Sequence, residues 1–288
     1  MGVDDPKSPY RGPPAATRDK RARERERGFP PPGNEAEVVR IEDVAPREQR
    51  LYGVNACLAV FAKRPEAIRK VWLVETRMPK LKAVLAFCVK HRVGYTVAGD
   101  EDLERLSGSA HHEGVCFAVL PAAELSLSAW LRDLPRGPAV ALWLDGVGNP
   151  HNFGAILRSA AHFGVAGALL PKDSELSLSG AAARIAEGGA EQVPMLRLGR
   201  SDNAVAQLQS AGFVLAVTVV RGGSALYSTT LPERLVLVIG AEQLGVTEEL
   251  ARAASLRLAI PGSGRVESLN VGAAAAVFLG EYWRQRQS

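Results

Sequence analysis

The chain has 288 residues and a formal net charge of +4, and 47% of its residues are hydrophobic. This composition is ample for globular cores, and the length predicts two domains. No apolar run approaches the ~18 residues of a membrane span, and the charged N-terminal region holds no apolar signal-peptide core, so we expect a cytoplasmic protein without membrane association. The small positive charge fits a nucleic-acid partner but does not require one.

The cysteines favour neither a metal site nor a disulfide framework. Cys57, Cys88 and Cys116 are widely spaced, lie in apolar surroundings and form no CxxC pattern. We therefore predict buried free thiols and no bound metal.

Residues 1–48 have the composition of a disordered, charged and proline-rich arm. They hold eight of the 18 prolines of the chain and almost no periodic apolar pattern. The run from Arg18 to Arg27 carries six basic and three acidic side chains. Two interpretations remain open for this run, an arm that contacts RNA and a solvated charged tail.

Residues 49–121 predict a small α/β domain. Helices are expected at 55–63 and 79–91 and after a cap at Asp100, and strands at 71–75, 95–97 and 115–120. The turn His111–Gly114 precedes the last of these strands. Because adjacent histidines seldom converge on one ion, this turn is interpreted as a polar turn rather than a metal site, and RNA contact by it is left open.

Residues 122–138 are expected to be a linker with one short helix around Trp130, and residues 139–288 a second domain. In the second domain strands and helices alternate, which predicts a parallel sheet with helices on both faces. Strands are expected at 139–145, 166–170, 195–198, 213–220, 235–239 and 256–260. Helices are expected at 152–163, 177–187, 201–211, 248–253 and 269–286.

The first polar cluster of the second domain follows its first strand, from Asp145 to Arg158. It is a near miss for the dinucleotide pattern GxGxxG, because His151 stands where the third glycine would allow close helix packing. Asn152 and Arg158 are six residues apart, and we expect them to converge if Asn152 lies in the loop before the helix. Arg158 sits among apolar residues, so it is interpreted either as a phosphate or hydroxyl contact or as part of a structural salt bridge.

Two further clusters follow later strands. Gly240 ends an apolar strand and Glu242 comes two residues later. The strand that ends at Ile260 leads into a glycine-rich turn and then to Ser268 and Asn270, where a small-residue helix begins. Glycines at strand exits let backbone groups approach a ligand closely. The serine and the asparagine are neutral hydrogen-bonding groups suited to an uncharged polar ligand.

Taken in this order, the three clusters resemble the SpoU (TrmH-type) RNA ribose 2′-O-methyltransferases. The matching motifs are Asn152-x-Gly154-x-x-x-Arg158, Gly240-x-Glu242-x-x-Gly245, and Ile260-Pro261 through Ser268-Leu269-Asn270-Val271. The resemblance covers residues 139–288. It extends to the first domain, residues 49–121, where the segments 51–56 and 111–115 resemble the L30e-like substrate-binding domain that precedes many SpoU catalytic domains.

The resemblance implies a parallel-sheet SPOUT domain with a C-terminal trefoil knot whose loops bind S-adenosylmethionine. Gly240, Ile260 and Leu269 would then contact this cofactor largely through their backbone. A ribose 2′-hydroxyl of tRNA or rRNA would attack the methyl group, with no metal and no nucleophilic cysteine.

The family gives the central catalytic role to Arg158. Because a guanidinium keeps its proton in proteins, we favour an electrostatic clamp over a base, although both roles stay open. Asn152 would support the site, Glu242 would orient Arg158 or its neighbours, and Ser268 and Asn270 would position the ribose and the loops.

Two features of the family bear on this sequence. Family members often have methionine after Ile-Pro, where this chain has Gly262, and a small polar residue where it has Gly272. Family members are also homodimers with active sites that combine both protomers. An apolar surface for such a contact is offered by the last helix, through Val271, Val277, Phe278, Tyr282 and Trp283, although packing on the chain's own sheet is compatible with this pattern.

Two other classes of function are weighed against the methyltransferase. A non-catalytic RNA-binding protein could retain the fold, but intact motif residues argue against it. A small-molecule α/β enzyme is disfavoured by the L30e-like domain at residues 49–121 and by the basic N-terminal arm. The sequence does not distinguish tRNA from rRNA as the substrate.

Overall fold

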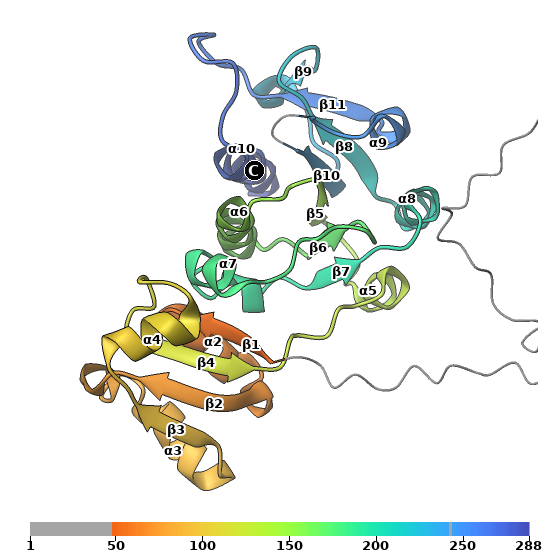
Figure 1. Cartoon of the computed structure of the whole chain (residues 1–288). Helices are drawn as coiled ribbons and strands as arrows, with labels where there is room; N and C mark the ends of the chain where they lie inside the picture. The colour runs from red at the N-terminus through yellow and green to blue at the C-terminus, as the bar shows by residue number, and fades with distance from the viewer. Residues whose placement is uncertain (1–47, 242–243, 288) are drawn as a thin grey trace, which may run out of the picture. The chain divides into compact units, whose positions relative to one another are not determined.

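Two β-sheets organise the protein in the computed structural model, which describes residues 48–241 and 244–287 (Figure 1). The predicted arm up to residue 47 and the motif residue Glu242 lie outside the described residues. The predicted architecture, a small α/β layer followed by a larger parallel sheet, is confirmed.

The first sheet has four strands in the order β1-β4-β2-β3 and is mixed, because only the β2–β3 pair is parallel. Its strands are β1 (Gln49–Tyr52), β2 (Ile68–Leu73), β3 (Gly94–Val97) and β4 (Val115–Val119). Its helices are α2 (Val54–Lys63), α3 (Lys82–His91) and α4 (Asp100–Ser107), with 3-10 turns η2 (Pro65–Ala67) and η3 (Glu75–Arg77). Helices α2 and α3 pack in the core on one face, and α4 covers part of the other.

Two expectations for this region were wrong. Strand β1 was not predicted, because its four residues are half polar and form no visible alternation. Asp100 does not cap α4 but is its first residue, and Gly99 stands at the N-cap without a side-chain bond. Instead, the acidic residues in the first turn of α4 interact favourably with the positive end of the helix dipole.

The second sheet has seven strands, all parallel, in the order β7-β6-β5-β10-β8-β11-β9. Its strands are β5 (Ala139–Asp145), β6 (Gly167–Leu170), β7 (Met195–Arg197), β8 (Val214–Thr218), β9 (Ser224–Ala225), β10 (Arg234–Gly240) and β11 (Leu256–Ala259). Its helices are α5 (Leu127–Asp133), α6 (Pro150–His162), α7 (Gly180–Ile185), α8 (Ser201–Ser210), α9 (Glu248–Ala253) and α10 (Val271–Arg286), with 3-10 turns η4 (Gly189–Glu191) and η5 (Leu226–Ser228). As Figure 1 shows, α6, α7 and α10 cover one face, and α5, α8 and α9 the other.

The central strands are apolar on both faces, as expected for a doubly covered sheet. All residues of β5 after Ala139 are buried, and so are the middle five of β10. Strand β5 pairs with β10 along its whole length, and this register places Asp145 beside Gly240 at the carboxyl end of both strands.

The segment 122–138, expected to be a linker, packs in part into the second core. Helix α5 lies within it, and Trp130 is 5% exposed and donates its indole N–H to the carbonyl of Ala166 at 2.9 Å. Ser126 caps the helix by accepting from the N–H of Ala129. A buried indole with a satisfied N–H anchors this half of the segment to the sheet.

Ion pairs join the first sheet region to the helices of the second. The guanidinium of Arg64 makes two 2.8 Å bonds to the carboxylate of Glu191, and both side chains are mostly buried. Glu113 accepts from the Arg184 Nε at 3.0 Å and from the backbone N–H of Val54 at 3.0 Å. The predicted polar turn at His111–Gly114 is therefore present, and both oxygens of its carboxylate are bonded within this chain.

The predicted buried thiols are confirmed. Cys57, Cys88 and Cys116 are all buried and free. Burial raises the pKa of the Cys116 thiol to about 11. Such a thiol stays protonated at neutral pH and is a poor nucleophile. Within the described residues, no helix is long and apolar enough to cross a membrane.

Candidate active site

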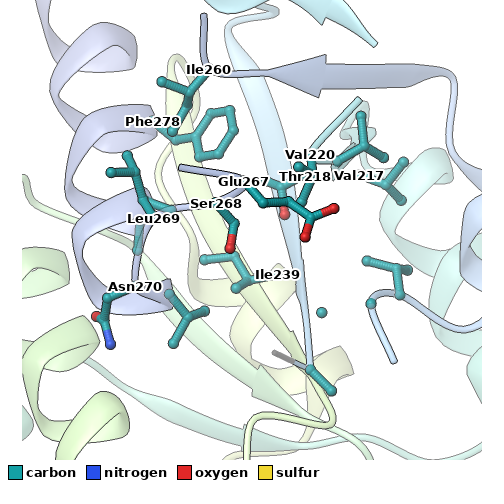
Figure 2. Close-up of a pocket in the computed structure, with 18 of the residues that line it drawn as sticks. Val217, Thr218, Val220, Ile239, Ile260, Glu267, Ser268, Leu269, Asn270 and Phe278 are labelled. Carbon is teal, nitrogen blue, oxygen red and sulfur yellow. The ribbon is translucent and has the colours of Figure 1, made fainter. Parts of the chain in front are cut away.

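A cavity of about 1070 Å³ lies at the carboxyl ends of β8, β10 and β11. In parallel α/β sheets this edge is where ligands bind, because the connecting loops gather there. The walls come from the loops that follow these strands, from the start of α6 and from α10. Apolar side chains such as Ile239 and Phe278 line one part of the cavity, and loop backbone lines much of the rest. Figure 2 shows this arrangement around Ser268.

The cavity brings together six of the eight predicted site residues. They are Asn152, Gly240, Ile260, Ser268, Leu269 and Asn270. The three sequence clusters, which are spread over residues 152 to 271, thus meet at one place. Glu242 lies outside the described residues, and Arg158 does not line the cavity.

Asn270 has a structural use for each end of its side-chain amide. Its Oδ1 accepts from the N–H groups of Gly272 and Ala273 and so caps α10, and such a cap stabilises a helix by ~1 kcal/mol. Its Nδ2 donates to Oδ1 of Asn152 at 3.0 Å. The pair therefore ties the loop after β11 to α6.

The condition for Asn152 and Arg158 to converge, that Asn152 lies in the loop before the helix, is not met. Helix α6 begins at Pro150, and Asn149 caps it by accepting from the N–H of His151. Proline at the first helical position and asparagine before it are a strong start signal. Asn152 is therefore the third residue of α6.

This position separates Asn152 from Arg158. Six residues along a helix correspond to about 9 Å of rise and roughly 240° of rotation, so the two side chains leave α6 on different faces. The side chain of Arg158 is exposed to solvent, although its neighbours Ile156 and Leu157 are fully buried. Among the described residues no ion pair includes Arg158, which argues against its interpretation as part of a structural salt bridge within this chain.

Close backbone contacts explain two of the motif glycines. A Cβ at Gly154 would lie 2.6 Å from the carbonyl oxygen of Ala182, so this glycine lets α6 pack against α7. A Cβ at Gly240 would lie 2.2 Å from the backbone carbon of Gly245. Ala241 and Gly245 exchange two backbone hydrogen bonds of 2.9 Å, which fold the chain back against the strand end. The carboxylate of Asp145 supports this turn by accepting from the N–H of Thr247 at 2.7 Å.

The loop from Pro261 to Asn270 is exposed along its whole length. No atom lies within 4 Å of a Cβ built at Gly262, so the larger residue that the family often carries there would fit. The first atom of a side chain at Gly262 would therefore meet no described atom of the chain.

The last helix offers less apolar surface to a partner than expected. Val271, Phe278 and Tyr282 are at most 8% exposed and belong to the core of their own chain. Val277 packs against the same core, and only Trp283, at 45% exposure, is open. Packing on the chain's own sheet accounts for most of the apolar pattern of α10.

Sequence reasoning missed Glu267 as a pocket residue. Its carboxylate points into the cavity on the side of Thr218, away from α10 and Leu269 (Figure 2). The only signal in the sequence was its place next to Ser268, which does not tell where a loop side chain points. The described lining residues include one other charged side chain, Arg257.

Metal ligands do not cluster in this part of the chain. Among residues 48–241 and 244–287, no group of three or more His, Cys, Asp or Glu side chains could hold an ion.

Comparison with protein families gives two matches. A model of the SpoU rRNA Methylase family matches residues 139–280. A model described as RNA 2′-O ribose methyltransferase substrate binding matches residues 50–125. Together the two matches cover both sheets.

Among curated relatives, the chain is 38% identical over 241 residues to a protein of Escherichia coli O157:H7 named "Uncharacterized tRNA/rRNA methyltransferase YfiF", covering 84% of this chain and 69% of that protein. It is 32% identical over 243 residues to the 23S rRNA (guanosine-2′-O-)-methyltransferase RlmB of Pseudomonas putida, covering 83% of this chain and 97% of that enzyme.

Solved structures with the same fold include an AdoMet-bound rRNA methyltransferase from Sinorhizobium meliloti, with a TM-score of 0.71 at 22% identity, covering 84% of this chain and 89% of that one. They also include the SpoU methyltransferase AviRb from Streptomyces viridochromogenes in complex with AdoMet. Its TM-score is 0.68 at 22% identity, and the match covers 84% of this chain and 91% of that one.

Proposed function

The chain belongs to the SpoU family of RNA methyltransferases, and we propose that it transfers a methyl group from S-adenosylmethionine to a ribose 2′-hydroxyl of ribosomal RNA. The observation that carries the proposal is the meeting of the three motif loops around one cavity. Ribosomal rather than transfer RNA is favoured by the RlmB relatives, because the match to them spans nearly their whole length.

The residues of the cavity fit S-adenosylmethionine. An adenosine ring system needs an apolar slot with backbone donors and acceptors, and Ile239, Ile260 and Phe278 supply apolar walls beside exposed loop backbone. Because Gly240 has no side chain, the backbone of Gly245 and Val246 lies close to the end of β10. Gly240, Ile260 and Leu269 would hold the cofactor, mainly through main-chain groups.

The bound cofactor supplies an electrophilic methyl group on a positively charged sulfur, and its leaving group is neutral. The protein therefore has to align the hydroxyl oxygen with the methyl carbon and to accommodate the proton that leaves the oxygen. Ser268 lies in the cavity at the loop end, where it would position the ribose. Asn152 and Asn270 bond to each other and act as positioning residues that fix this loop against α6.

Arg158 is proposed to clamp RNA phosphate and the developing oxyanion, but not at the cavity of its own chain. It is exposed and lies on another face of α6 from Asn152. A homodimer in which Arg158 approaches the cavity of the second copy would satisfy both the exposure and the catalytic role. Glu242 is proposed to orient that arginine.

The domain plan is likewise a proposal: an arm at 1–48, an RNA-binding domain at 49–121, a connecting segment at 122–138 and a methyltransferase domain at 139–288. It is supported by the two family matches, which begin and end close to these bounds. The trefoil knot implied by the family stays a prediction.

Replacing Glu267 with glutamine is expected to lower affinity for S-adenosylmethionine by roughly two- to fivefold and to leave affinity for S-adenosylhomocysteine nearly unchanged. The reason is that the donor carries one positive charge more than the product, and the Glu267 carboxylate points into the cavity. Calorimetric titration of both ligands measures the effect. Glu249→Gln, an exposed α9 residue outside the cavity, is the control. Equal losses for both ligands would show that Glu267 contacts a part that they share.

The experiment that tests the proposed function is a map of ribose methylation in ribosomal and transfer RNA from cells with and without this protein. We expect one or more 2′-O-methyl positions in ribosomal RNA to disappear without it. Loss confined to transfer RNA would overturn the substrate assignment. No loss, together with RNA binding but no binding of S-adenosylmethionine, would favour the non-catalytic RNA-binding alternative.

A further inference from the structure

An acid-free basic segment lies at one edge of the first sheet. Residues 76–99 contain five lysines and arginines and no aspartate or glutamate. The whole chain has a net charge of only +4, so the remainder is slightly acidic. The segment comprises α3, β3 and the turns next to them. The segment therefore carries a local excess of five positive charges.

The structure leaves this edge uncovered. Within residues 48–241 and 244–287, strand β3 is the last strand of its sheet and pairs only with β2, and all four of its residues are exposed. Tyr95 and Val97 are 43% and 49% exposed. Tyr95 is in register with Val71, whose side chain belongs to the core under α3, so Tyr95 projects from the face of the sheet that α3 covers.

The charged side chains of this edge are free of acidic partners. Lys80, Lys82, Lys90 and Arg92 are exposed, and within the described residues no carboxylate lies within ion-pair distance of them. Glu75 borders the segment in η3, and the acidic residues that follow it lie on α4, which packs against β1 and β4. Arg77 is set apart, because it donates to the carbonyl of Glu113.

We propose that Lys80, Lys82, Lys90, Arg92 and Tyr95, named here the α3–β3 edge, form a contact surface for the substrate RNA. The proposal rests on the proposed function and adds to it the place where RNA is held outside the active site. Unpaired lysines and arginines neutralise phosphates and release counterions. An exposed tyrosine among them offers a face on which an unpaired base stacks.

The positive charge of the α3–β3 edge disfavours a second copy of the chain as its binding partner. A twofold-symmetric contact places the same patch against itself, which here would oppose two clusters of like charge. Lysines beside an exposed edge strand also discourage strand pairing between copies. A polyanion such as RNA is the partner whose charge complements the edge.

The test is a variant with four substitutions, Lys80→Gln, Lys82→Gln, Lys90→Gln and Arg92→Gln. Its affinity for a transcribed fragment of 23S rRNA is measured from about 50 to about 300 mM KCl. Each lost phosphate contact lowers the slope of log affinity against log salt by about 0.7 to 0.9, so for four contacts we expect a total decrease of about 2.8 to 3.6 and a loss of roughly tenfold or more at low salt. Tyr95→Ala alone is expected to weaken binding without changing the slope.

The matched control removes the same charge elsewhere, through Lys63→Gln, Arg136→Gln, Lys172→Gln and Arg252→Gln, all at exposed positions outside the cavity. We expect this variant to keep nearly the wild-type slope. Equal losses in both variants would overturn the proposal, because net charge alone would then explain binding. A change of oligomeric state in the edge variant, seen by sedimentation, would also overturn it and would favour contact between copies.

Failure of this proposal differs from failure of the proposed function. If the wild-type protein methylates rRNA and the edge variant binds RNA as the wild type does, only the α3–β3 edge is wrong. If the wild-type protein neither binds S-adenosylmethionine nor methylates RNA, the proposed function itself is wrong. Calorimetry with S-adenosylmethionine is expected to give the same affinity for both variants, which shows that the cavity is intact.

Discussion

Replacing Arg158 with alanine is expected to abolish measurable methyl transfer while leaving S-adenosylmethionine affinity within about twofold of wild type. Loss of one preorganised charge at the reacting atoms typically costs ~10²–10³ in turnover. The cofactor should be unaffected, because Arg158 does not line the cavity of its own chain. Methyl transfer from labelled donor to rRNA and calorimetric titration of the donor measure the two effects.

A lysine at the same position separates charge from geometry. Arg158→Lys keeps the positive charge but loses the planar fork that grips two oxygens, so we expect intermediate activity. Because Arg158 is exposed, neither substitution should change thermal stability much. Near-normal turnover of the alanine variant would show that the catalytic assignment is wrong.

Mixing two inactive variants tests whether Arg158 serves the second copy. If the active site combines both protomers, subunits with Arg158→Ala and subunits with Ser268→Ala should regain activity when they are allowed to exchange. A mixed dimer then has one site with both residues intact. No recovery, in a mixture that exchange of tagged subunits shows to be formed, would place Arg158 and Ser268 of one chain at the same site.

Replacing Gly240 with alanine is expected to weaken binding of S-adenosylmethionine by roughly tenfold to more than a hundredfold. The added Cβ would lie 2.2 Å from the backbone carbon of Gly245 and 2.5 Å from the N atom of Val246. Backbone atoms cannot rotate away as a side-chain end can, so the turn against β10 has to move, and overpacking of this kind typically costs 1–3 kcal/mol. Calorimetry with the cofactor measures the loss.

The control for this substitution is Gly199→Ala. Gly199 is exposed, lies outside the cavity, and has no atom within 4 Å of a built Cβ. We expect wild-type affinity for this variant. Wild-type affinity for Gly240→Ala as well would mean that the turn at 241–245 does not contact the cofactor.

The sequence predicted the second domain well, because its strands are long apolar runs. Strand β5 was predicted with its observed bounds, and β10 within one residue at each end. Glycine and proline at the strand ends indicated where loops gather, and six predicted residues do line one cavity. The last helix was expected to begin at Leu269, but it begins at Val271, because the side chain of Asn270 caps it.

Three features were beyond sequence reasoning for physical reasons. The two-residue strand β9 and the half-polar β1 are too short for a period to be seen. The apolar sequence neighbours of Arg158 do not tell whether its own side chain is buried. A helix turns by about 100° per residue, so Arg158 can face solvent although the residues next to it are buried. The direction of the Glu267 side chain depends on the path of its loop, which no local pattern specifies.

The most direct test of the account is to incubate the purified protein with rRNA and S-adenosylmethionine labelled in its methyl group, and then to digest the RNA to nucleosides. We predict that the label is recovered in 2′-O-methylnucleosides and that Arg158→Ala removes it. Label in base-methylated nucleosides, or no transfer by a protein that binds the cofactor, would contradict the account.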